Sequence, residues 1–273
     1  MRLGRIGYVN CYPVYGAIDR GLVAVPASLV TGTPAELNDR LADGRLDVSV
    51  ISAVAYARHA ADYDLLPDLA ISSDGPVRSV LLFSRRPPGQ LDGARVLVST
   101  SSRTSVELLG LLARDHWHVA LDAAPAPTEP GDLAGLSAVP HDGVLVIGDA
   151  ALLLTAQRAY PHVTDLGQAW KTWTGLPFVF AIWAARRAVD RQGVRDVHRA
   201  LLASRKWGLG HLGDLAERAS EATGVEHGTC REYLAGLDYG LSYRHLAGLT
   251  DFLRRLAAHG AVPDGTLSFL GAA

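Results

Sequence analysis

A turn rich in hydroxyl groups carries the strongest chemical signal in the sequence. Residues 99–105 (STSSRTS) have a hydroxyl at nearly every position and lie between an expected strand and an expected helix. Free backbone N–H groups, hydroxyl donors and the positive end of a helix dipole together suit a carboxylate or a phosphate. Capping alone needs one Ser or Thr. We therefore favour an anion site that uses Ser101, Ser102, Thr104 and Ser105.

Three further turns carry polar side chains with two possible roles each. The Asn10 amide can donate to and accept from a ligand, or it can form an N-cap or Asx-turn before Pro13. Asp149 follows a buried strand as either a helix cap or a ligand contact, and position alone favours the cap. Ser79 enters a long strand, where it either points to a cleft or is simply a tolerated strand residue.

Other constellations are weaker. His116 and His118 resemble a metal dyad but have no third ligand at a suitable spacing, so surface histidines are the favoured interpretation. Trp170, Trp173 and Phe178 surround residues 174–177 and form either a cleft wall or a core cluster. The sequence lacks Walker A, GxGxxG, GxSxG and HExxH motifs, and we expect no metal and no cofactor.

Short apolar runs alternate with helical periodicity along the first two thirds of the chain. A capping box with a following proline, Thr33 to Glu36, opens one of the helices. The pattern predicts an α/β fold with two lobes, each a mixed sheet flanked by helices, and a ligand cleft between them. We expect strands near residues 3–9, 27–31, 46–51, 77–84, 95–98, 143–147 and 178–184, and terminal helices near 189–207, 211–223, 228–237 and 242–259.

The second lobe is expected to be inserted into the first. Lobe 1 would contain residues 1–86 and 181–273, and lobe 2 residues 87–180. The chain would cross between them near residues 83–90 and 176–183, and these crossings would act as hinges.

Composition narrows the class of protein. The 273 residues are 48% hydrophobic and 20% charged, which is enough apolar material for a substantial core. With 26 basic and 28 acidic residues, the chain has no electrostatic footprint for nucleic acid. Its apolar runs are too short to span a membrane, its start does not resemble a signal peptide, and Cys11 and Cys230 make no disulfide framework. We expect a cytoplasmic protein with no nucleic-acid or membrane partner.

Six motifs, in this order along most of the chain, resemble those of the chorismate dehydratase family, which acts in the futalosine route to menaquinone. The family has the fold of type 2 periplasmic binding proteins. The motifs are residues 8–13 (YVNCYP), 46–52 (LDVSVIS), 77–80 (VRSV), 99–106 (STSSRTSV), 147–150 (IGDA) and 174–180 (TGLPFVF).

The resemblance implies a bacterial hydro-lyase that eliminates water from chorismate, a small dicarboxylate, to give 3-[(1-carboxyvinyl)oxy]benzoate without a cofactor. In the family, an asparagine and a serine at the positions of Asn10 and Ser79 contact the substrate, which makes these two the expected catalytic residues. The expected substrate-binding residues are Ser52, Ser101, Ser102, Thr104, Ser105, Gly148, Asp149, Pro177 and Phe178.

The catalytic base and two rival functions stay open. The base is either the enolpyruvyl carboxylate of the substrate or a protein group such as Asp149. The nearest rival is 1,4-dihydroxy-6-naphthoate synthase, which has the same fold. That family has a histidine in an Ile-His-Glu-like motif where this chain has Ile147-Gly148-Asp149, and it lacks the Asn-x-x-Pro pattern found at Asn10. A non-catalytic protein that binds or senses a small anion is the rival from another class.

Overall fold

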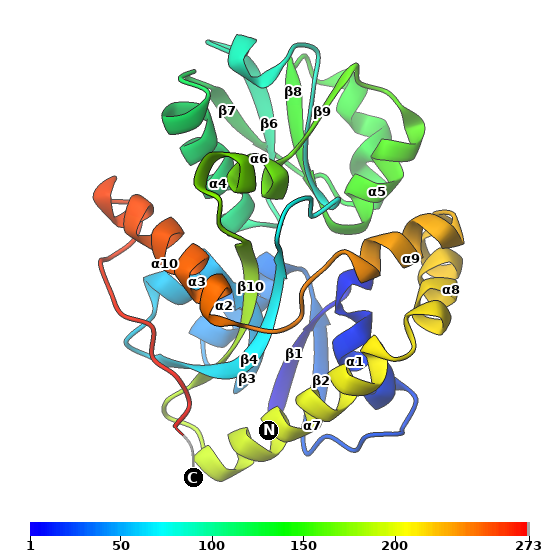
Figure 1. Cartoon of the computed structure of the whole chain (residues 1–273), viewed down its shortest axis with the longest axis vertical. Helices are drawn as coiled ribbons and strands as arrows, with labels where there is room; N and C mark the ends of the chain where they lie inside the picture. The colour runs from blue at the N-terminus through cyan, green and yellow to red at the C-terminus, as the bar shows by residue number, and fades with distance from the viewer. Residues whose placement is uncertain (272–273) are drawn as a thin grey trace.

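Two five-stranded mixed sheets organise the chain, which a computed structural model describes over residues 1–271 (Figure 1). Sheet A has the order β2-β1-β3-β10-β4, and sheet B has the order β7-β6-β8-β5-β9. Sheet A contains β1 (Arg2–Ile6), β2 (Ser28–Gly32), β3 (Val48–Ser52), β4 (Tyr63–Ser73) and β10 (Phe178–Arg186). Sheet B contains β5 (Val80–Ser84), β6 (Arg95–Ser99), β7 (Asp122–Ala126), β8 (Gly143–Ile147) and β9 (His162–Asp165).

The two sheets have the same plan. In sheet A, β1 runs parallel to β2 and β3, and β10 runs antiparallel to β3 and β4. In sheet B, β6 runs parallel to β7 and β8, and β5 runs antiparallel to β8 and β9. The predicted α/β architecture of two mixed sheets flanked by helices is confirmed.

Helices surround both sheets, and most of them belong to lobe 1, which is built on sheet A (Figure 1). Its helices are α1 (Tyr12–Asp19), α2 (Pro34–Ala42), α3 (Ala53–Arg58), α7 (Arg191–Leu209), α8 (Leu212–Thr223), α9 (His227–Ala235) and α10 (Tyr243–Ala258). Lobe 2, built on sheet B, has α4 (Arg103–Leu111), α5 (Gly148–Gln157) and α6 (Leu166–Thr174). The predicted capping box starts α2, since Thr33 Oγ1 accepts from Glu36 N–H and Glu36 Oε2 accepts from Thr33 N–H. Among residues 1–271, no helix combines the length and the apolar run that crossing a bilayer requires.

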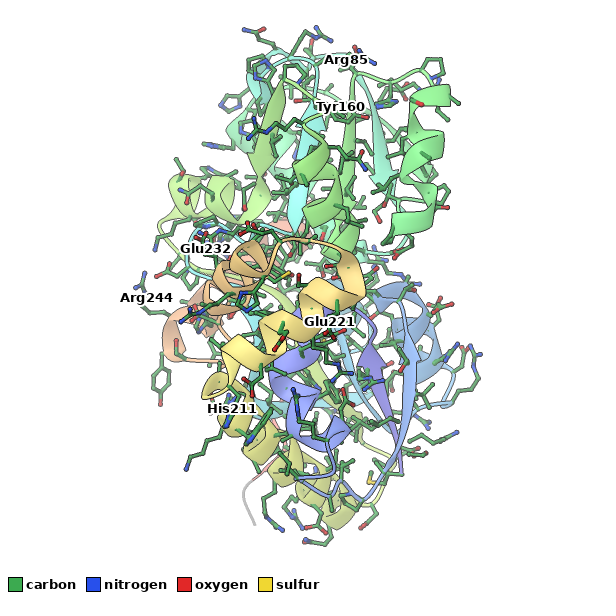
Figure 2. The ribbon with its side chains drawn as sticks, turned by 90° about the vertical axis from the view of Figure 1, so that its right-hand side faces the viewer. Arg85, Tyr160, His211, Glu221, Glu232 and Arg244 are labelled. Atoms are coloured by element: carbon green, nitrogen blue, oxygen red, sulfur yellow. The ribbon has the colours of Figure 1, made fainter. Side chains whose placement is uncertain are left out.

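The first predicted crossing is wrong. Strand β5 pairs with β8 and β9, so its residues belong to sheet B, and the chain passes between the sheets at residues 74–79 instead of 83–90. Figure 2 shows Arg85 at the end of lobe 2 that is farthest from lobe 1. The second crossing, residues 175–177, touches the start of its predicted range, because β10 returns to sheet A at Phe178. The turn signal of the sequence RRPPG marked the outer end of a strand and not a change of lobe.

Strand β4 was not predicted, and its sequence explains why. Pro67 lies in its middle, and a proline normally argues against a strand because it cannot donate to the ladder. Here β4 is an edge strand of sheet A, and its register with β10 shifts between Leu65 and Ala70, around Pro67. The edge position and the irregularity together accommodate the proline.

Candidate active site

A small cavity lies between the two lobes, and five of the eleven predicted site residues line it: Asn10, Ser52, Ser79, Ser102 and Ser105. It encloses about 50 Å³. Its polar lining consists of Tyr8, Asn10, Ser52, Ser79, Ser102 and Ser105. Its apolar lining consists of Ile6, Pro34, Ile71, Val77, Val80, Ile147, Phe180 and Ala181. These residues come from both lobes and from the crossing at 74–79, as expected for a two-lobed α/β protein.

Asn10 and Ser79 meet in this cavity although they are far apart in the sequence. Asn10 lies in the one-turn helix η1 (Val9–Cys11) after β1, and Ser79 ends the crossing before β5. The Ser79 hydroxyl accepts a hydrogen bond of 2.8 Å from the buried Tyr233 hydroxyl. Asn10 Oδ1 is buried and has no hydrogen-bond partner among residues 1–271, which leaves it able to accept from a ligand.

The hydroxyl-rich turn divides between the cavity and the contact between lobes. Ser102 caps α4 by accepting from the N–H of Ser105, and both side chains line the cavity. Ser101 instead donates to Glu129, and Thr104 accepts from the N–H of Val54 in lobe 1. Of the four residues predicted to form an anion site, Ser102 and Ser105 line the cavity at the start of α4, and Ser101 and Thr104 lie outside it.

Oxygen atoms of lobe 2 accept hydrogen bonds from backbone N–H groups of lobe 1 at three points around the cavity. Each of these N–H groups belongs to the first turn of a helical segment, where helices leave donors unpaired. The pairs are Val9 N–H to Asp149 Oδ1 at 3.1 Å, Ala35 N–H to the Ser101 carbonyl at 3.2 Å, and Val54 N–H to Thr104 Oγ1 at 3.0 Å. The lobes are therefore closed upon each other in this structure.

Asp149 belongs to this contact and not to the cavity lining. Burial raises its pKa to about 6, with the N–H of Val9 opposing the shift and the charge of Glu129 adding to it. The preceding Gly148 has φ of +61° and packs against the ring of Tyr8. Both residues hold the lobes together, and neither reaches the cavity in this closed arrangement.

Ser52 combines the two roles that a polar residue in a strand-to-helix turn can have. Its hydroxyl accepts from the N–H of Ala55 and so caps α3. It also accepts from the Asn38 amide at 3.2 Å, and it lines the cavity.

Pro177 and Phe178 lie outside the cavity. Phe178 packs with Trp170, Phe180 and Phe252, with ring centroids 4.6–5.3 Å apart. The Pro177 carbonyl lies against Gly248 of α10, where no side chain would fit. Phe180, which occupies the register shift of β10, reaches the cavity instead.

Sequence reasoning missed Tyr8, Glu129, Tyr233 and Phe180. Tyr8 donates to Glu129 across the lobes at 2.7 Å, and its pKa is raised by burial and then by this hydrogen bond. Tyr8 and Phe180 belong to two of the motifs found in the sequence, residues 8–13 and 174–180, and these motifs could have marked both as site residues. Glu129 lies in a proline-rich loop and Tyr233 in a C-terminal helix, and no local pattern marks either of them.

The cavity is electrically neutral in its lining. No Asp, Glu, His, Lys or Arg within residues 1–271 lines it. The described part of the chain also has no group of three His, Cys, Asp or Glu side chains that would hold a metal ion, and His116 stacks on Trp173. An anion in this cavity would be bound by hydroxyls, amides and helix N–H groups.

Comparisons with known proteins agree with this architecture. A family model described as menaquinone biosynthesis matches residues 1–258. A protein of Thermus thermophilus named chorismate dehydratase is 36% identical over 239 residues, covering 82% of this chain and 84% of the relative.

Two solved structures show the fold. Protein AF1704 from Archaeoglobus fulgidus matches with a TM-score of 0.80 at 19% identity, covering 96% of this chain and 98% of its own. The periplasmic aliphatic sulphonate binding protein of Escherichia coli matches with a TM-score of 0.67 at 14% identity, covering 100% and 94%. The chain has the two-lobed fold of periplasmic binding proteins, and by its match to the family model and to this enzyme it belongs to the menaquinone biosynthesis family.

Proposed function

We propose that this protein is a hydro-lyase that eliminates water from chorismate and releases 3-[(1-carboxyvinyl)oxy]benzoate. The chorismate dehydratase of Thermus thermophilus supports this substrate and reaction. The elimination creates an aromatic ring and is strongly downhill, so the task of the protein is to hold the ring and to select this outcome. The proposal includes a cytoplasmic location, in keeping with a family that acts in biosynthesis.

The meeting of Asn10 and Ser79 in one cavity carries the proposal. Beside them, Ser102 and Ser105 present their hydroxyls at the start of α4. An amide, three hydroxyls and the first-turn N–H groups of a helix thus surround one small space. This set of neutral donors suits a substrate with two carboxylates and one departing hydroxyl.

We assign one substrate carboxylate to Ser102, Ser105 and the N-terminus of α4, where the helix dipole favours negative charge. Asn10 and Ser79 bind the departing hydroxyl and the second carboxylate. Their hydrogen bonds strengthen as charge develops on the leaving oxygen, and such bonds accelerate the chemical step.

The substrate itself supplies the base in this proposal. The enolpyruvyl carboxylate takes the proton from the ring carbon that bears the enolpyruvyl ether, and the electrons of that C–H bond form the new ring double bond. The C–O bond on the neighbouring carbon breaks, and the proton and hydroxide together make one water. Two observations support this choice. Within residues 1–271, no carboxylate, histidine or lysine lines the cavity, and Asp149 accepts a hydrogen bond from the N–H of Val9. The protein then acts by enforcing geometry.

The test is incubation of the purified protein with chorismate, followed by chromatography and mass analysis. We expect a product lighter by one water, with no added cofactor. Asn10→Ala and Ser79→Ala should each lower kcat by about a hundredfold to a thousandfold, because each removes a donor to developing charge. Ser137→Ala, an exposed serine of lobe 2, is the control and should not change the rate.

Two outcomes would contradict the proposal. Chorismate that is bound but recovered unchanged would indicate a small-anion binding protein. Loss of turnover in Asp149→Asn with intact product binding would indicate a protein base in place of the substrate carboxylate.

A further inference from the structure

Tyr233 is a buried side chain that contacts Ser79 from α9, a helix with no recognised motif. Its hydroxyl donates to Ser79 Oγ at 2.8 Å, across 154 residues of sequence. The tyrosine is 1% exposed, and burial strongly raises its pKa. Tyr233 therefore keeps its proton at all ordinary pH values and lies beside both expected catalytic side chains.

Helix α9 is fixed to the crossing that carries Ser79. The Arg78 guanidinium donates to the carbonyl of Glu232 at 2.8 Å, one residue before Tyr233. Directly after the helix, Asp238 and Ser72 exchange backbone hydrogen bonds of 2.8 and 3.0 Å at the end of β4. Figure 2 shows Glu232 at the level where the two lobes meet. The Tyr233 hydroxyl thus has a defined position relative to Ser79.

This contact determines what the Ser79 hydroxyl can do. A serine hydroxyl has one proton to donate, and it rotates to suit its partners. Because Tyr233 donates to Ser79 Oγ, the Ser79 proton must point elsewhere. Its other protein acceptor is the Val77 carbonyl at 3.5 Å, which is too long for a strong hydrogen bond. The Ser79 proton is then free to be donated into the cavity.

We propose that Tyr233 is a positioning residue that orients the Ser79 hydroxyl as a donor toward the substrate. The inference rests on the proposed dehydration. Tyr233 acts through Ser79 and does not line the cavity itself. Removing its hydroxyl should slow the chemical step and leave substrate binding nearly unchanged, because a freely rotating Ser79 donates in the productive direction for only part of the time.

The experiment compares Tyr233→Phe with Tyr239→Phe, using chorismate as substrate. Tyr239 is also fully buried, but its hydroxyl has no hydrogen-bond partner among residues 1–271, which makes it a matched control. We expect Tyr233→Phe to lower kcat about tenfold, the loss that one hydrogen bond of ordinary strength represents, with KM nearly unchanged. Tyr239→Phe should keep the rate of the unchanged protein, and both variants should unfold within a few degrees of it.

A double-mutant cycle separates positioning from a general structural effect. In a Ser79→Ala background, Tyr233→Phe should cause no further loss, because the hydroxyl that it orients is gone. An equal loss in both backgrounds, or an unchanged kcat in Tyr233→Phe alone, would overturn this inference while leaving the dehydratase proposal intact. If the unchanged protein forms no product from chorismate, the proposed function fails and this inference fails with it.

Discussion

At the scale of single residues, the site separates neutral groups from ionisable ones. Hydroxyls and an amide line the cavity, while the carboxylates of Asp149 and Glu129 lie behind it in the contact between lobes. Since substrate carboxylates would be repelled by ionised side chains of the same sign, this arrangement keeps negative charge away from the binding surface. At Asp149 this separation lowers the stability of the folded protein at neutral pH, because burial disfavours the charged form of its carboxyl group.

Asp149 predicts a pH dependence of stability. Its pKa is about 6 in the folded protein against an ordinary value of 3.8, so the folded state holds the proton more tightly. Its contribution to stability is therefore fully present below about pH 4 and is lost as pH rises through 6, by roughly 3 kcal/mol in total. Asp149→Asn keeps an oxygen acceptor for Val9 N–H but does not titrate, so its unfolding free energy should rise above that of the unchanged protein as pH goes from 4 to 7.

Chemical denaturation at several pH values measures this difference. Asp122→Asn, at an exposed carboxylate of β7, is the control and should show no such divergence. A difference between Asp149→Asn and the unchanged protein that stays constant from pH 4 to pH 7 would contradict the role given to burial.

At the scale of elements, the turn between β8 and α5 belongs to lobe 2 and packs against lobe 1. Gly148 has a positive φ there, and its N–H donates to the Ser79 carbonyl at 2.8 Å. A Cβ at this position would lie 2.7 Å from the Tyr8 ring, closer than a real contact allows. The turn therefore requires glycine both for its backbone conformation and for the closure of the lobes.

Gly148→Ala should consequently destabilise the protein by more than about 1 kcal/mol and weaken product binding, since it strains the backbone and displaces Tyr8. Gly110→Ala is the matched control, because a Cβ there, near the C-terminal end of α4, meets open space. It should be neutral or slightly stabilising. Thermal unfolding and product titration of both variants test the difference, and equal behaviour of the two would refute this account of the turn.

At the scale of the whole molecule, the structure is a closed form. The cavity of about 50 Å³ has room for only a few waters, whereas small-molecule sites enclose roughly 300–1,000 Å³. A ring with two carboxylates cannot enter unless the lobes separate. The two crossings, at residues 74–79 and 175–177, are the segments that can absorb this motion.

Small-angle X-ray scattering should detect the motion. We expect the free protein to have a larger radius of gyration than the closed structure, and saturating 3-[(1-carboxyvinyl)oxy]benzoate to reduce it. The product is used because it is not consumed. Identical scattering curves with and without product would count against hinge closure.

The sequence by itself determined the class of fold and several of the turns that line the cavity. Alternating apolar runs and helical periods predicted two α/β lobes, because these patterns follow from local geometry. The motifs around Asn10, Ser79 and residues 99–105 identified turns that line the cavity. In two-lobed α/β proteins the ligand cleft lies beyond the carboxyl ends of the strands, where such turns stand. Local patterns could not locate the change of lobe at 74–79, because a strand of either sheet has the same period.

Only the tertiary structure decided which of these residues meet. It brought Ser102 and Ser105 to the cavity and directed Ser101 and Thr104 to the lobe contact, although all four share one turn. It also placed Tyr233 behind Ser79. The physical reason is that such contacts depend on how helices pack and how two lobes close. Both are set by interactions between residues far apart in the sequence, such as Tyr233 and Ser79, which are 154 positions apart.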